Sequence, residues 1–317
     1  MTFAEILASP FVLEIIVKAL VVGTLVSLCA ALLGVPLVLK RYSMIGDGLS
    51  HIGFGIAGIA AALGVSTDMS LEFSIPFVIV AAVLLLKISE NSKIKGDAAI
   101  AMMSTGAVAI GVIAYDKTTG MTADICNSLF GSASIITISE KDLILSILLS
   151  VLVLAMFIIL YNRIFMMTFD ENFGKATGIK TGLCKIMISL FSAITIVLGM
   201  KLMGALMISA VIIFPALTAM RLCKSFKSVT ICAAVVSVVC YWIGFAAATR
   251  LSLQTGPCVI IANLVCFGAF ALIGKFNSLP LQLKTVNPVC IFADFSTQIM
   301  RLLDGNFSSP MYSPFLL

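Results

Sequence analysis

Two ionisable side chains spaced four residues apart are the part of this sequence best suited to chemistry. Asp47 and His51 lie in the apolar stretch SMIGDGLSHIGFGIAG, residues 43–58. In a helix, such a pair projects from one face, about 6 Å apart along the axis. A carboxylate and an imidazole so placed can converge on one cation. They favour Zn(II), Mn(II) or Fe(II) over Ca(II) and Mg(II), which prefer all-oxygen shells.

A purely structural role for this pair is the alternative. Asp47 could cap the start of its helix while His51 bonds a neighbouring backbone or hydroxyl group. A charged residue at membrane depth usually marks an ion or substrate path. Two ligands are too few for a closed structural site, so we expect completion by a second copy of the chain or a weak transit site. Small residues that allow close helix approach support the functional interpretation, and they are Gly46, Gly48, Gly53, Gly55 and Gly58.

The composition is that of a membrane protein. Of the 317 residues, 61% are hydrophobic and 11% charged, and the mean hydropathy is +1.17, whereas soluble domains carry about 25% charged residues. One histidine and 15 acidic residues leave most soluble metalloenzyme designs without ligands. The net charge of +5 is a membrane-topology signal rather than a nucleic-acid one. The nine cysteines form no CxxC pair and are expected to be apolar filler.

Long apolar runs recur along almost the whole chain. A membrane-spanning helix needs about 20 apolar residues, and runs that are continuously apolar rather than alternating exclude barrel strands. The predicted fold class is all-α, a polytopic membrane protein with about nine transmembrane helices, of which the third and sixth are short. The expected spans are residues 13–39, 43–64, 74–89, 97–115, 142–161, 185–200, 203–221, 228–249 and 256–274.

The basic residues assign sides to the spans. Lys and Arg gather on cytoplasmic connections, which places the N-terminus outside and the C-terminus in the cytoplasm. The outer connections hold only Lys117, Lys141, Lys201 and Arg250. The cytoplasmic set is Lys40, Arg41, Lys87, Lys93, Lys95, Arg163, Lys175, Lys180, Lys185, Arg221, Lys224, Lys227, Lys275 and Lys284.

Three segments and one proline depart from this pattern. A half-apolar piece within residues 124–138 is too short to cross and suits an outer surface or re-entrant helix. In the cytoplasmic loop, Asp170 and Glu171 open a short helix that Gly178 could close. Residues 277–317 form a cytoplasmic tail, expected to be poorly ordered, after a transmembrane domain of residues 1–276. Pro215 is expected to kink the seventh span, a structural role.

The chain carries no G-x-x-x-x-G-K-[ST] loop, so it cannot hydrolyse ATP by a P-loop itself. Energy for transport must come from a gradient or from a partner.

Four stretches in order carry a family resemblance: LVLKRYSMIGDGLSHIGFG (37–55), KGDAAIA (95–101), FDENFGKATG (169–178) and MGALMISAVIIFPALTAMR (203–221). Over about residues 10–275 the chain resembles the permease subunits of bacterial ABC importers for zinc, manganese and iron, which implies a type II importer-like fold. The tail after Lys275 is outside the shared pattern.

The resemblance also implies partners and roles. Such a permease is a homodimer in the bacterial plasma (inner) membrane, paired with a cytoplasmic ATP-binding subunit and served by an extracellular or periplasmic metal-binding protein. It has no intrinsic cofactor, and a divalent metal is its cargo. Asp47 and His51 match the transit ligands. Residues 169–180 match the coupling helix that docks on the ATPase, with Phe169, Asp170, Glu171, Ala176 and Gly178 as its expected coupling residues.

The leading hypothesis is therefore a permease subunit, not an enzyme, that admits zinc, manganese or iron with ATP on separate subunits; we favour zinc. The alternative is a gradient-driven metal carrier acting without an ATPase. An intramembrane protease is disfavoured: an aspartyl enzyme needs two membrane carboxylates, and adjacent Ser50 and His51 point about 100° apart on a helix.

Overall fold

The computed structural model describes residues 10–40, 42, 44–65, 67–91, 96–118, 140–178, 181–251 and 253–278. All regular elements among these residues are α-helices, which confirms the all-α class. The half-apolar piece within residues 124–138 and the tail beyond residue 278 lie outside the described residues.

Nine long helices follow one another through the described ranges and coincide with the nine expected spans. Eight of them contain a stretch long and apolar enough to cross a membrane. The exception is the third, where only Phe73–Leu85 is strongly apolar. The helices are α2 (Pro10–Leu39), α3 (Met44–Ala62), α4 (Thr67–Asn91), α5 (Gly96–Thr118), α7 (Glu140–Phe169), α9 (Thr181–Met203), α10 (Ala205–Leu222), α11 (Phe226–Leu251) and α12 (Thr255–Ser278).

The sixth span is longer than the sequence predicts. Helix α9 begins at Thr181 and its apolar stretch runs to Met200, whereas residues 185–200 were expected to be short for a full crossing. Thr181 and Cys184 are buried, so the helix is already packed before Lys185. A lysine does not end such a helix, because its methylene stem lies along apolar surface while the ammonium group reaches water.

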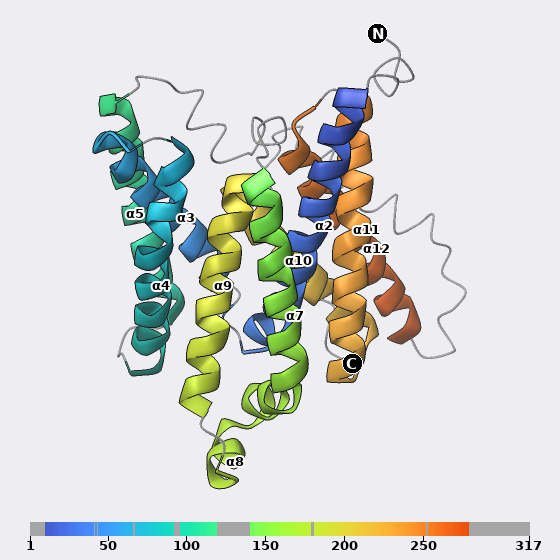
Figure 1. Cartoon of the computed structure of the whole chain (residues 1–317). Helices are drawn as coiled ribbons and strands as arrows, with labels where there is room; N and C mark the ends of the chain where they lie inside the picture. Colours follow the sequence, from blue (N-terminus) through green and yellow to red (C-terminus); the bar gives the residue numbers. More distant parts are fainter. Residues whose placement is uncertain are drawn as a thin grey trace, which may run out of the picture. The chain divides into compact units, whose positions relative to one another are not determined.

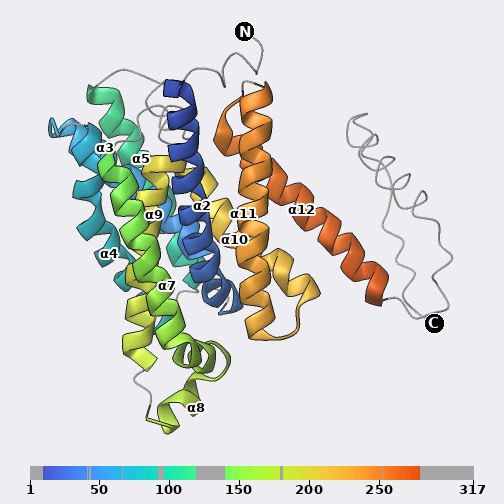
Figure 2. The same cartoon turned by 45° about the vertical axis from the view of Figure 1, so that its right-hand side comes forward.

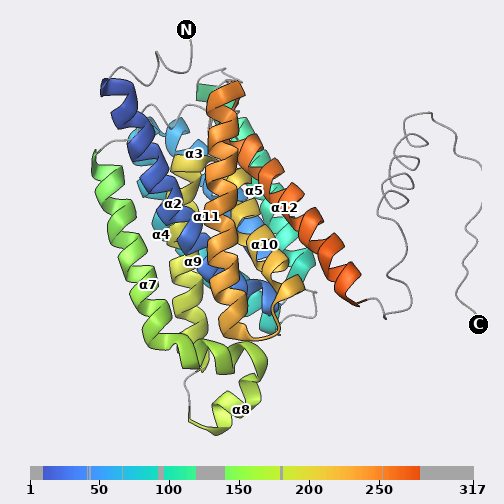
Figure 3. The same ribbon diagram turned by 90° about the vertical axis from the view of Figure 1, so that its right-hand side faces the viewer.

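Helix α2 is buried on two faces and organises the bundle. It contributes residues to both large hydrophobic clusters, and it packs directly against α7, α9, α10 and α11. Three hydrogen bonds join it to α11, which lies beside it in Figure 3. Tyr241 donates to the Ala19 carbonyl at 3.0 Å and Ser237 donates to the Ser27 carbonyl at 2.9 Å. The third runs from the Trp242 indole to the Thr24 hydroxyl at 2.9 Å. Such bonds hold helices together where lipid supplies no hydrophobic drive.

Glycines set the position of α3, as the sequence predicts. A methyl group at Gly55 would overlap the Ala107 carbonyl of α5, and one at Gly58 would lie 2.8 Å from the Gly111 oxygen. Gly46 faces Ile212 of α10. Helix α3 therefore packs with its backbone against α5 (Figure 1), whereas at Gly46 it approaches only a side chain of α10.

A short helix, α8 (Glu171–Ala176), lies between α7 and α9 in sequence and packs against both. Figures 1 and 2 show it beyond the ends of α7 and α9. The chain divides into two compact units, Met1–Ala271 and Leu272–Leu317, and the described part of the second unit is the last turns of α12. The permease domain of residues 1–276 and the tail of residues 277–317 stay a prediction.

Candidate metal-transit site

The two candidate ligands both lie near the start of α3. The amide of Ile45 donates to the Tyr42 carbonyl at 3.0 Å, which leads the chain from α2 into α3. Asp47 falls in the first turn of α3, where a carboxylate is favoured by the positive end of the helix dipole. His51 follows one turn later. The placement of Asp47 therefore also fits its role as a stabilising residue at a helix start.

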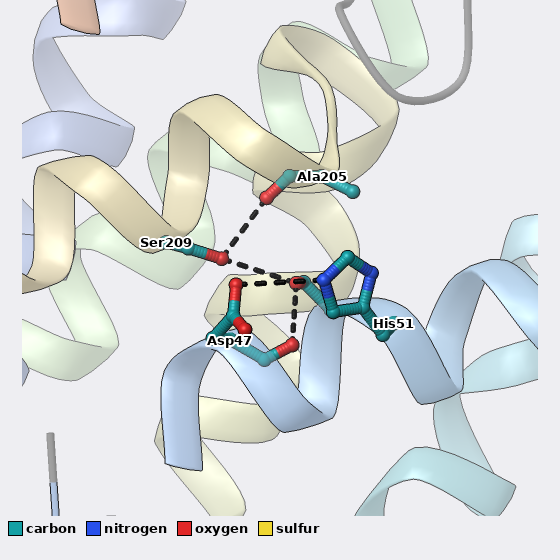
Figure 4. Close-up of polar contacts among 5 residues, drawn as sticks. Asp47, His51, Ala205 and Ser209 are labelled. Carbon is teal, nitrogen blue, oxygen red and sulfur yellow. Dashed lines mark hydrogen bonds and ion pairs between the residues drawn. The ribbon is translucent and has the colours of Figure 1, made fainter. Parts of the chain in front are cut away.

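The carboxylate and the imidazole face each other. His51 Nε2 lies 3.5 Å from Asp47 Oδ1 (Figure 4), and the side chains are 18% and 34% exposed respectively. Two ligands of one tetrahedral ion at bond lengths of about 2.0–2.1 Å lie roughly 3.3 Å apart. The observed separation is thus close to the edge of such a coordination shell, and the Asp47 side chain keeps an accessible surface.

The second ring nitrogen of His51, Nδ1, is buried. Among the described residues, no group bonds His51 Nδ1. The alternative in which His51 bonds a neighbouring backbone or hydroxyl group is therefore not observed there; its polar contact is with Asp47. A metal-bound histidine normally places its other ring nitrogen against a carbonyl, carboxylate or water. Among the described residues, no carbonyl or carboxylate makes this supporting contact with Nδ1.

A pair of buried hydroxyls fixes α3 against α10 beside the site. Ser50 Oγ donates to the Asp47 carbonyl at 2.8 Å and lies 3.1 Å from Ser209 Oγ. Ser209 Oγ is also 3.1 Å from the Ala205 carbonyl (Figure 4). Sequence reasoning missed Ser209. The signal that could have identified Ser209 was its position in the 203–221 stretch, six residues before Pro215. Both residues are buried within α10.

The ligand set of one copy is incomplete. Among the described residues, no three His, Cys, Asp or Glu side chains gather where they could hold a metal ion. Within the described part of the chain, Asp47 and His51 are therefore the two side chains at this point that could bind a cation, and its remaining positions would go to other groups. This is the arrangement of a weak site rather than of a closed structural one.

The candidate coupling segment has the predicted local structure. Helix α8 starts at Glu171, and the Asp170 carbonyl accepts a hydrogen bond from the Gly174 amide at 3.1 Å. Gly178 follows the helix with φ of 80°, a left-handed conformation that glycine adopts without strain. Phe169 and Ala176 are exposed. The structure therefore places a short helix with exposed side chains at the end of α7.

Comparisons with known proteins find relatives that are named as membrane proteins of metal transport systems. A probable metal transport system membrane protein of Thermotoga maritima is 30% identical over 250 residues, covering 78% of this chain and 86% of the relative. The high-affinity zinc uptake system membrane protein ZnuB of Haemophilus influenzae is 27% identical, covering 80% and 95% respectively. Other relatives are named for manganese import and for iron transport.

A solved structure shares the fold. PsaBC from Streptococcus pneumoniae in complex with Fab superposes with a TM-score of 0.71 at 23% identity, over 87% of this chain and 96% of that one. The family model described as the ABC 3 transport family matches residues 12–273. Since that match spans most of the sequence, the chain belongs to the ABC 3 transport family.

Proposed function

We propose that the chain is the membrane permease subunit of an ATP-driven importer that moves a divalent transition metal ion into the cytoplasm. The observation that carries the proposal is the Asp47–His51 pair, 3.5 Å apart in one of the membrane-spanning helices. Family membership and the names of relatives for zinc, manganese and iron transport support it.

The metal is the cargo, and Asp47 and His51 are its transient ligands. Asp47 Oδ1 and His51 Nε2 bind it together, and a second copy of the chain supplies an equivalent pair. A site with few protein ligands holds the ion long enough to replace its water, yet releases it when the helices move. The Ser50–Ser209 contact keeps α3 in place beside α10 while the ion passes.

ATP is bound and hydrolysed on a separate cytoplasmic subunit, since this sequence has no P-loop. Helix α8 is the docking element for that subunit, with Phe169, Asp170, Glu171, Ala176 and Gly178 as its coupling residues. The chain itself is then a permease and not an enzyme. An extracellular or periplasmic protein delivers the metal.

The chain is a multi-pass protein of the bacterial plasma (inner) membrane, with its N-terminus outside and its C-terminus in the cytoplasm. The excess of Lys and Arg in the connections on the same side of the membrane as α8 supports this orientation. A carboxylate and an imidazole without a thiolate disfavour Cu(I) and suit zinc, manganese and iron. Among these three, zinc is the cargo that we favour.

The test is metal uptake into vesicles that contain the chain with and without its ATP-binding subunit, with zinc, manganese and iron assayed in parallel. We expect uptake only with the subunit and ATP. Uptake by the chain alone would instead establish a gradient-driven carrier.

The site is tested in the same vesicles with Asp47→Ala and His51→Ala. Each variant should lose uptake at normal protein level. Asp116→Ala, which removes an exposed carboxylate near the end of α5, should retain it. Full uptake by both site variants would refute the transit assignment.

A further inference from the structure

A cluster of aromatic rings joins the last turns of α7 to the first turn of α11. Phe226 is the first residue of α11 and is only 5% exposed. The centroid of its ring lies 5.5 Å from that of Tyr161, 5.5 Å from that of Phe165 and 6.1 Å from that of Phe169, all on α7. Figures 1 and 3 show these ends of the two helices side by side. Phe226 therefore fills the space between α7 and α11.

Phe169 connects this cluster to α8. It is the last residue of α7, and α8 begins at Glu171. The Asp170 amide donates to the Met166 carbonyl at 2.9 Å, and the Asp170 carbonyl accepts a hydrogen bond from the Gly174 amide at 3.1 Å. Because α7 leads into α8 through this single residue, the direction of α8 depends on how Phe169 is held.

Helix α8 is short and mostly exposed. It has six residues, and an isolated helix of that length is not stable in water. Among its described residues, Gly174 is buried, against Thr181 at the start of α9. The exposed ones are Asn172, Lys175 and Ala176. With so little of its own surface packed, α8 needs a firm anchor where it leaves α7.

The start of α11 offers that anchor. The Ser228 amide donates to Ser225 Oγ at 3.3 Å and the Val229 amide to the Ser225 carbonyl at 2.9 Å, so the first turn is capped. Residues 223–225 connect it to α10, and α10 packs against α3, which carries the metal-transit pair. A displacement of Phe226 therefore carries the start of α11 and the end of α10 with it.

We propose that Phe226 is a positioning residue for α8. By holding Phe169, it fixes the direction of α8 and links this helix to the hairpin of α10 and α11. The two rings meet at an interplanar angle of 83°, the edge-to-face arrangement that aromatic pairs favour. The consequence for transport rests on the docking role proposed for α8: when the ATP-binding subunit moves α8, the two rings pass the displacement to α10.

The first experiment measures amide hydrogen exchange in residues 170–178 of the purified full chain, by rapid quench and mass spectrometry. In Phe226→Leu, these amides should exchange about threefold to tenfold faster, the range expected for lost aromatic contacts. Phe226→Tyr, which keeps the ring, should retain the slow exchange.

The matched control for this experiment is Phe157→Leu. Phe157 is 4% exposed, belongs to the same hydrophobic cluster as Phe226, and its ring lies 6.3 Å from that of Tyr161. The control removes the same atoms from the same core, so it should lower the unfolding temperature to a similar extent. Exchange in residues 170–178 should stay at the wild-type rate, because Phe169 keeps its contact.

The second experiment measures the number of metal ions taken up per ATP hydrolysed, with the chain and its ATP-binding subunit reconstituted in vesicles. Phe226→Leu should lower this ratio about threefold to tenfold. The metal concentration for half-maximal uptake should stay within about twofold, because the metal-transit pair is untouched. Phe157→Leu should keep the wild-type ratio.

Unchanged exchange in Phe226→Leu, or equally fast exchange in Phe157→Leu, would overturn the proposal whatever the transport result. Faster exchange in Phe226→Leu with a normal uptake ratio would uphold the positioning of α8 by Phe226 and refute the docking role of α8. The two experiments together therefore separate a failure of this inference from a failure of the proposed function.

Discussion

At the scale of single residues, the separation of Asp47 and His51 is set by one turn of one helix. If both side chains hold the same ion, removing either one dismantles the site, and removing both does little more harm. Removing even a supporting partner of a metal ligand costs about 10- to 100-fold in affinity, so each of Asp47→Asn and His51→Gln should reduce uptake by about tenfold or more. The double variant should be no worse than the more severe single variant, as measured by initial uptake rates at matched protein levels. Losses that multiply would indicate independent roles.

Ser50 has a positioning role that a smaller change can reveal. Its hydroxyl contacts Ser209 across the α3–α10 interface, yet Ser209 keeps a bond to Ala205 without it. Ser50→Ala should therefore lower stability by about 1 kcal/mol and leave uptake within about twofold. Thermal unfolding in detergent and vesicle uptake measure the two effects. The control Thr105→Ala, whose exposed hydroxyl bonds only its own helix, should change neither. Abolished uptake in Ser50→Ala would make the serine a ligand instead.

Local spacing could predict the ligand pair but not its surroundings. Asp47 and His51 are brought together by helix periodicity alone, so their juxtaposition was accessible from the sequence. Ser209 lies 159 residues from Ser50 in the chain, and only tertiary packing joins them. Ser189 and Ser192, whose buried hydroxyls bond no group among the described residues, were equally unpredictable, because a hydroxyl that does not bond its own helix looks like any other serine in a sequence.

At the scale of elements, the α3–α5 contact depends on glycines that admit the neighbouring backbone. A methyl group in Gly55→Ala would overlap the Ala107 carbonyl, and because backbone cannot step aside like a side chain, the helices must separate. The expected cost is about 1–3 kcal/mol of stability, with reduced uptake because α3 carries the ligands. Gly106→Ala on α5 meets nothing within 4 Å and should be neutral or slightly stabilising. Equal unfolding temperatures for the two variants would contradict this packing.

Two glycines that follow α8 in the sequence, Gly178 and Gly182, give a second contrast. Gly178 has φ of 80°, a conformation that costs an L-residue roughly 1–2 kcal/mol, whereas Gly182 in α9 has open space around it. Gly178→Ala should distort the end of α8 and lower metal-stimulated ATP hydrolysis in the assembled transporter severalfold, with the chain still folded. Gly182→Ala should leave that stimulation intact. If both variants behave like the wild type, α8 does not transmit the signal.

The helices themselves were largely predictable, for a physical reason. A bilayer demands a long, continuously apolar helix, so each of the nine runs in the sequence corresponds to one helix of the structure. Two boundaries differ from the apolar runs. Helix α9 starts at Thr181 rather than residue 185, and Thr181 and Cys184 in its first turn are buried. Helix α4 runs well beyond its apolar stretch Phe73–Leu85.

At the scale of the whole molecule, the described residues of one copy supply two ligands, Asp47 and His51, so the complete transit site should need two copies. Co-expression of the wild type with His51→Ala in equal amounts tests this. Random pairing leaves about one quarter of dimers with two intact copies, so uptake should fall to about a quarter if a mixed dimer is inactive. It should fall only to about half if each copy conducts by itself. Matched expression of the two copies, checked by distinct tags, makes the two outcomes distinguishable, and a value near half would place the whole metal path within a single chain.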